Sequence, residues 1–434
     1  MSPLARLLAA RGEEVIGSDR SFDQGRNLPF FEQLRAEGIR LVPQDGSGLD
    51  SSIDHFIVTR AVEEAIPDVR RARELGLPVL KRPLLMARLF AGTRSVAVGG
   101  TGGKSTTTGM IGRILDAEGM DPTIMNGAIM LDYGSNCRSG RSGLSVFEAD
   151  ESDGMNDAVA VCPRSIAVLT NISLDHFELP ELRSIFGEFV KNAAEGVVLN
   201  MDCPFSAELK PLHPRTVTFG MTHGADFTPE KSPVSLRLPG RHNTANALAA
   251  LAACSLLGVP AARAARILGD FGGIQRRLEL VGEARGVRVV DDFASSPAKI
   301  GAALQTLAER GGRLIAVFQP HGFQPTKMMR QGYIEVFSRQ LRPDDCVIMP
   351  EIYYAGGTLN LVDGKVIPLP KDISARDLIE EIRKEHAHAY YFEERAAIPS
   401  FLAELAAPGD TIVVMGSRDE SLPEFARSIL AALA

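Results

Sequence analysis

Short apolar runs alternate along most of this chain with stretches in which apolar residues recur at helical spacing. Over the first 80 residues the pattern predicts helices at 4–11, 31–37 and 67–75 and strands at 14–18, 39–43, 55–59 and 78–80. Such short alternation is typical of a parallel sheet covered on both faces. Sheets of this kind open with a strand, whereas this sequence starts within a helix. We therefore expect a nucleotide-type fold that lacks its first strand.

The same alternation continues through two further segments. Strands are predicted at 95–99, 145–148, 166–170 and 196–200, followed by helices at 243–257 and 261–269. Gly272 and Gly273 then interrupt the pattern. Beyond them, strands at 287–291, 314–318, 345–349 and 411–415 and helices at 297–310, 374–386 and 398–405 predict a third α/β unit. We expect three domains, at 1–90, 91–273 and 274–434.

Composition narrows the class of protein. A chain of 434 residues with 45% hydrophobic and 23% charged residues is an ordinary globular protein, and no apolar run reaches the ~18 residues of a membrane span. A net charge of −7 disfavours a nucleic-acid partner and favours small-molecule chemistry. The five cysteines have neither zinc-site nor disulfide-framework spacing, so we expect a protein of the reducing cytoplasm.

The most informative stretch is SVAVGGTGGKSTTT at 95–108, an apolar strand that runs into a glycine-rich turn. Such a turn can wrap its backbone N–H groups around a phosphate, and a lysine and a hydroxyl follow for charge and Mg²⁺. The alternative is an ordinary glycine-rich strand-to-helix turn. We favour binding of a nucleoside triphosphate, with these candidate residues: Gly100, Thr101, Gly102, Gly103, Lys104, Ser105 and Thr106.

Two clusters of polar residues follow predicted strands. EADESD at 148–153 places four carboxylates in six residues, which indicates a cation site that includes Glu148, or else a solvated acidic turn. TNISLDH at 170–176 ends in His176, which is either a second metal ligand or a structural histidine.

Two further clusters are candidates for nucleotide contacts. Asn243 and Asn246 lie three residues apart on one helical face and could read an adenine edge, although Asn243 could instead cap the helix. The pairs at 276–277 and 291–292 combine arginines with carboxylates, which suit a γ-phosphate and a ribose.

Taken in order, these motifs resemble the Mur ligase family of ATP-dependent amide-forming enzymes, within it the alanine-adding enzymes and the murein tripeptide ligases. The similarity rests on GSD at 17–19, TRAV at 59–62, GTGGKSTTT at 100–108, EADESD, TNISLDH, GRHNTANALAA at 240–250, RRLE at 276–279, DDF at 291–293 and FQPH at 318–321. It implies an N-terminal nucleotide-sugar domain, a central P-loop ATPase and a C-terminal Rossmann-like domain.

The resemblance also implies the chemistry. ATP would phosphorylate a substrate carboxylate, and an amine would attack the acyl phosphate. Lys104 would neutralise the transferring phosphoryl group, Ser105 and Glu148 would hold Mg²⁺, and His176 would bind a second ion. Asn243 or Asn246 would contact adenine. Arg277 would contact phosphate and Asp292 the ribose.

This chain departs from the alanine-adding pattern where the amine substrate binds. DDYxHHP is replaced by DDFASSP at 291–297, and PHRYTRT by PHGFQPT at 320–326, so two arginines that would grip an amino-acid carboxylate are absent. The acceptor and the oligomeric state stay open. Two other functions also stay open: a P-loop ATPase or kinase that forms no amide, and a degenerate nucleotide-binding regulator.

Overall fold

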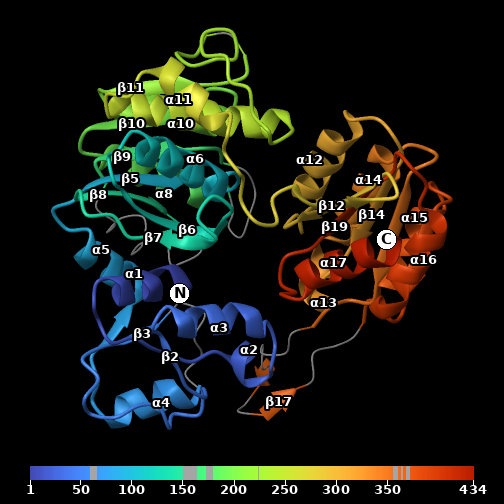
Figure 1. Cartoon of the computed structure of the whole chain (residues 1–434), viewed down its shortest axis with the longest axis horizontal. Coiled ribbons are helices and arrows are strands. Elements are labelled where there is room, and N and C mark those ends of the chain that lie inside the picture. The colour runs from blue at the N-terminus through green and yellow to red at the C-terminus, as the bar shows by residue number, and fades with distance from the viewer. Residues whose placement is uncertain are drawn as a thin grey trace. The chain divides into compact units, whose positions relative to one another are not determined.

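A computed structural model describes residues 1–58, 66–149, 164–172, 179–222, 224–354, 360–362, 365–367 and 372–434. The chain divides into two compact units, Met1–Gln275 and Arg276–Ala434, which run from blue to yellow and from yellow to red in Figure 1. No helix in the described ranges combines the length and hydropathy of a membrane span.

The N-terminal part of the first unit contains two parallel strand pairs. Its elements are α1 (Ser2–Ala10), β1 (Ile16–Gly17), α2 (Arg20–Asp23), α3 (Leu28–Ala36), β2 (Arg40–Leu41), β3 (Phe56–Val58), α4 (Pro67–Glu74), β4 (Val79–Lys81) and α5 (Arg82–Leu89). Strand β1 pairs with β2, and β3 with β4. A doubly wound sheet with strand order 3-2-1-4-5 would consist of two separate pairs, 3-2 and 4-5, if its first strand were absent. The pairs β1–β2 and β3–β4 correspond to these two pairs. The absence of a first strand stays a prediction.

The rest of the first unit is built on a larger sheet. Its elements are β5 (Arg94–Gly99), α6 (Lys104–Ala117), β6 (Thr123–Met130), β7 (Ser135–Arg138), β8 (Leu144–Glu148), β9 (Ile166–Leu169), α8 (Leu179–Lys191), β10 (Gly196–Asn200), α9 (Pro204–Ala207), β11 (Thr216–Phe219), α10 (Arg241–Leu256) and α11 (Ala261–Leu268). The strand order is β11-β10-β9-β5-β8-β6-β7, and only β7 is antiparallel among these described strands.

Strand β5 lies at the centre of this sheet and is buried on both faces. Val96 and Val98 pack into the cluster formed with α6, α10 and α11, whereas Ala97 packs into the cluster formed with α1, α5 and α8. Successive side chains of a strand point to opposite faces, so an uninterrupted apolar run is what a doubly covered strand requires. The turn that follows β5 therefore starts from a fixed support.

The second unit is also a covered, mainly parallel sheet. Its elements are β12 (Glu279–Ala284), β13 (Val287–Asp292), α12 (Pro297–Ala308), β14 (Leu314–Phe318), α13 (Phe323–Met328), α14 (Arg330–Gln340), β15 (Cys346–Pro350), β16 (Asn360–Val362), β17 (Lys365–Ile367), α15 (Ala375–Arg383), β18 (Ala389–Phe392), α16 (Ile398–Leu405), β19 (Thr411–Met415) and α17 (Leu422–Leu433). The strand order is β12-β13-β19-β14-β15-β18, with β12 antiparallel. The described strands β16 and β17 pair separately.

The sequence pattern predicts several elements to the residue, including the strands at 196–200, 314–318 and 411–415 and the helix at 398–405. Strand β6 was not expected. Its pairing with β8 stops after Met125. The next two residues, Asn126 and Gly127, interrupt the apolar pattern by which a strand is predicted. Both residues belong to the candidate site described below.

Gly112 lets helix α6 approach strand β6 closely. A Cβ at this position would lie 2.6 Å from Cδ1 of Ile124 and 3.0 Å from its Cγ1. Alanine is a better helix former than glycine by about 1 kcal/mol, but overpacking costs about 1–3 kcal/mol. We predict that Gly112→Ala lowers the melting temperature in thermal unfolding. Adding Ile124→Val, which removes Cδ1, should recover part of the loss, and a higher melting temperature for Gly112→Ala alone would contradict this packing.

Candidate active site

The glycine-rich turn joins the buried strand β5 to helix α6. Gly100 has φ 124° and Gly103 has φ 82°, conformations that residues with a side chain rarely adopt. Gly103 is the N-cap of α6, and no described side chain caps this helix end. The first N–H groups of the helix are therefore suited to bind an anion. The Lys104 ammonium lies over the same turn and donates to the Gly100 carbonyl at 2.8 Å.

Residues at the end of strand β9 hold this turn from one side. The Thr101 hydroxyl donates to Asn171 Oδ1 at 2.7 Å, and the Gly102 N–H donates to the same oxygen at 3.0 Å. Asn171 Nδ2 and the Thr170 hydroxyl donate to the Gly102 carbonyl at 3.1 and 2.6 Å. A Cβ on Gly100 would lie 2.2 Å from Thr170 Oγ1, so this contact requires glycine. The turn is a fixed structure, and the network that fixes it includes Asn171, which our site prediction omits.

Glu148 lies on the other side of β5. It is the register partner of Val98 in the parallel β5–β8 pair, so its carboxylate stands at the same edge of the sheet as the turn. Glu148 is 9% exposed, and the Gly127 N–H donates to its Oε1 at 2.6 Å. A Cβ on Gly127 would lie 3.0 Å from both carboxylate oxygens. Only a residue with no side chain leaves this carboxylate in its place.

The segment after the β6–β8 pairing connects Glu148 to the phosphate-binding turn. Asn126 Nδ2 donates to the Ser105 carbonyl at 2.9 Å, and the next residue, Gly127, holds Glu148. Sequence reasoning missed Asn126 and Gly127. A polar residue and a glycine inside an apolar strand are the signal that could have found them, because such a pair marks a close approach of backbone to another group.

These residues fit a divalent cation. Carboxylate and hydroxyl oxygens are ligands that Mg²⁺ accepts, and Glu148 and Ser105 supply them at one edge of the sheet. In the described part of the chain the buried Glu148 carboxylate accepts one hydrogen bond and pairs with no cation. No group of three or more His, Cys, Asp or Glu residues gathers among the described residues. His176 and the carboxylates at 150–153 lie outside the described residues, so their metal roles stay predictions.

Asn246 of helix α10 lies directly against the phosphate-binding turn. A Cβ on Gly103 would lie only 2.4 Å from Asn246 Oδ1. Asn243 Nδ2 donates to the Pro239 carbonyl at 2.7 Å, and the helix N-cap is Gly240, so Asn243 does not act as the cap. Both asparagines are buried, and Asn246 is brought to the turn. Their contact with adenine stays a prediction.

Two adjacent arginines of the second unit, Arg276 and Arg277, differ in burial and in their contacts. Arg276 is buried, pairs with Asp291 at 3.2 Å and donates to the Gly416 carbonyl at 2.7 Å. Arg277 is only partly buried and stacks on the Phe293 ring at 5.0 Å. A guanidinium already committed to a buried carboxylate is a poor ligand for phosphate, so Arg277 is the better candidate.

The two adjacent aspartates also differ. Burial raises the pKa of Asp291 to about 6, although Arg276 opposes the change. Asp292 accepts hydrogen bonds from the Leu278 N–H at 2.7 Å and the Ala294 N–H at 2.8 Å. These two bonds fix the orientation of Asp292, and its contact with a ribose stays a prediction.

Phe186 of α8 lies on the face of strand β5 opposite to helix α6. Its side chain is fully buried, and its ring packs with Phe189 beneath Gly99, where a Cβ would come within 3.1–3.3 Å of the two rings. Phe186 therefore supports the strand below the turn and supplies no charge.

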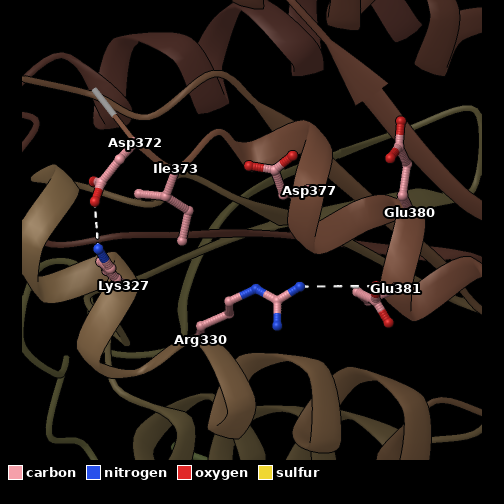
Figure 2. Close-up of a pocket in the computed structure, with 7 residues that line it drawn as sticks. All are labelled: Lys327, Arg330, Asp372, Ile373, Asp377, Glu380 and Glu381. Atoms are coloured by element: carbon pink, nitrogen blue, oxygen red, sulfur yellow. Dashed lines mark hydrogen bonds and ion pairs between the residues drawn. The ribbon is translucent and has the colours of Figure 1, made fainter. Parts of the chain in front are cut away.

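A pocket of about 250 Å³ in the second unit is a poor candidate site. Figure 2 shows that its cations already have acidic partners: Lys327 pairs with Asp372, and Arg330 lies 3.8 Å from Glu381. The pocket contains none of the predicted site residues, and a site for an anionic ligand needs charges that are not already paired.

A glycine-rich turn between a buried parallel strand and a helix, with a lysine at the helix start and a carboxylate on the next strand, is the arrangement of a P-loop nucleotide-binding domain. Comparison with known families defines the class further. Residues 1–94 match the Mur ligase catalytic domain, 98–254 the Mur ligase middle domain and 276–418 the Mur ligase glutamate ligase domain.

Individual relatives agree with these matches. A UDP-N-acetylmuramate–L-alanine ligase of Rubrobacter xylanophilus is 35% identical, over 97% of this chain and 95% of its own length. A ligase of the same name from Acidothermus cellulolyticus is 34% identical, over 96% and 89%. The crystal structure of UDP-N-acetylmuramate–alanine ligase from Thermotoga maritima has the same fold, with TM-score 0.81, 24% identity and coverage of 99% and 96%.

The chain belongs to the Mur ligase family, and the resemblance seen in its motifs is confirmed. It is therefore an ATP-dependent ligase that forms an amide from an acid and an amine.

Lys104 is the residue whose removal tests the nucleotide site most simply. We predict that Lys104→Ala lowers ATP turnover at least about 100-fold, because a preorganised positive charge on the transferring phosphoryl group is lost. The melting temperature should change little, since the Lys104 side chain is only partly buried. Lys191→Ala, which removes an exposed lysine 3.6 Å from Glu188, is the matched control. Turnover that survives Lys104→Ala would contradict the assignment.

Proposed function

We propose that this protein joins the carboxylate of UDP-N-acetylmuramate, or of a related cell-wall precursor, to the amine of an amino acid or peptide. Support comes from the names of relatives that are 34–35% identical over nearly the whole chain. The observation that carries the proposal is the fixed P-loop turn between Glu148 and Asn171. On this proposal the protein takes part in peptidoglycan precursor synthesis.

Bound ATP and Mg²⁺ would supply the phosphoryl group that activates the carboxylate as an acyl phosphate, from which the amine displaces phosphate. In our proposal the backbone N–H groups at 100–106 hold the phosphates, and Lys104 offsets their charge. Ser105 and Glu148 orient the cation, and His176 binds a second one.

The nucleotide contacts predicted from the sequence complete the proposal. Asn243 or Asn246 contacts the adenine, Arg277 the phosphate and Asp292 the ribose. The position of Asn246 against Gly103 supports the first of these roles. The partly buried guanidinium of Arg277 stacks on Phe293 and forms no ion pair with any residue in the described ranges, which supports the second. We also propose the cytoplasm as the compartment. The four described cysteines, Cys137, Cys203, Cys254 and Cys346, carry free thiols, which a reducing compartment maintains.

The proposed function is tested by measuring ADP release from purified protein with MgATP, UDP-N-acetylmuramate and a panel of amino acids. We predict that ADP release requires both the acid and the amine, and that ADP and amide form in equal amounts. Removing Mg²⁺ with EDTA should abolish the reaction, because the phosphate charge is then unscreened. ADP release at the same rate with and without an amine would contradict amide formation and favour a simple ATPase.

A further inference from the structure

The carboxyl edge of the second unit's sheet has the geometry of a ligand site. Strand β19 lies between β13 and β14 and is parallel to both. The helices after β13 and β14, α12 and α14, pack in one cluster, whereas α17 after β19 packs in the cluster of the opposite face. The loops after β14 and β19 therefore diverge. In open α/β sheets, ligands bind in the crevice that such divergence leaves.

Three side chains gather at this point. His321 follows β14, and Ser417 and Arg418 follow β19. The Ser417 Oγ lies 3.5 Å from His321 Nδ1. Burial, together with the charge of Arg418, lowers the pKa of His321 below its usual value, so the imidazole is neutral at pH 7. Arg418 is exposed, and in the described part of the chain no carboxylate forms an ion pair with it.

The loop that carries Arg418 is held on both sides. The Gly416 carbonyl accepts a hydrogen bond from Arg276 at 2.7 Å. Asp419 is 2% exposed and pairs with Arg395, whose guanidinium also stacks on an aromatic ring. The charges of Arg276 and Arg395 are thus committed to buried carboxylates. Arg418 is the cation of this loop that a ligand can use, and it is displayed from a fixed backbone.

The neighbouring turn after β14 cannot easily supply such a charge. Gly322 has φ 68°, and a Cβ there would lie 3.2 Å from Pro325 Cδ. An arginine at 322, where the resemblance leads one to expect it, would be strained in this backbone. A guanidinium for this edge of the sheet must therefore come from another loop.

We propose that Arg418 binds the carboxylate of the amine substrate and so makes this protein specific for amino acids over simple amines. The inference rests on the proposed function and deepens it. A guanidinium matches a carboxylate with two parallel hydrogen bonds, which an ammonium cannot reproduce. The neutral His321 and the Ser417 hydroxyl stand beside it as uncharged hydrogen-bonding groups.

The test compares L-alanine with L-alaninamide, which keeps the amine and lacks the carboxylate charge. For the wild type we expect kcat/KM for ADP release to be about 10- to 100-fold higher with L-alanine. Arg418→Ala should lower this value for L-alanine by about the same factor, mainly through KM, and leave it unchanged for L-alaninamide. Arg418→Lys should be intermediate. The KM for ATP should not change. Arg427→Ala, which removes another exposed arginine of this unit, is the control.

Several outcomes would overturn the inference. They are an unchanged preference for L-alanine in Arg418→Ala, an equal loss for both amines, or a raised KM for ATP, which would assign Arg418 to a phosphate. A wild type that uses both amines equally well would also overturn it while leaving amide formation intact. A wild type with no amine-dependent ADP release would contradict the proposed function as well.

Discussion

The structure of the ATP-binding region depends on the order of three parallel strands, β8-β5-β9, in one buried sheet. This order puts Glu148 on one side of the glycine-rich turn and Thr170 and Asn171 on the other. Hydrogen bonds between the Asn171 side chain and both Thr101 and Gly102 then fix a glycine-rich backbone that would otherwise be flexible. Because the conformation is set before a ligand arrives, little of the binding energy is spent on ordering the loop.

Glycines around this site serve two different purposes. Gly100 and Gly103 adopt positive φ angles, whereas Gly127 is needed because a methyl group would meet the Glu148 carboxylate. The second unit uses buried charges instead: Arg276 and Arg395 hold the backbone and side chains of the loop at 416–419. In both units, hydrogen bonds or ion pairs from neighbouring side chains fix the loops that carry the candidate site residues.

Much of the ATP-binding region could be predicted from the sequence, because the phosphate-binding turn and its flanking strand and helix are consecutive in the chain. The carboxylate at Glu148 follows from the same logic, since parallel strands end at one edge of a sheet. Asn126 and Gly127 could not be found this way, because their role depends on where the β6–β8 pairing stops. The different surroundings of Arg276 and Arg277 likewise needed tertiary structure, since the two arginines are adjacent in the sequence and Arg276 alone of the two pairs with the buried Asp291. Arg418 belongs to none of the motifs found in the sequence, and its proposed role follows from the loops around it.

The central claim is that the bonds from strand β9 preform the phosphate-binding turn. Asn171→Ala tests it directly, because it removes the side-chain bonds to Thr101 and Gly102 and leaves the strand intact. The measurement is the Kd for MgATP by calorimetry, beside Asn192→Ala, which removes an exposed asparagine at the end of α8. The account predicts a Kd raised about tenfold or more for Asn171→Ala, at roughly 1 kcal/mol for each lost bond, and no change for the control. An unchanged Kd for Asn171→Ala would contradict it.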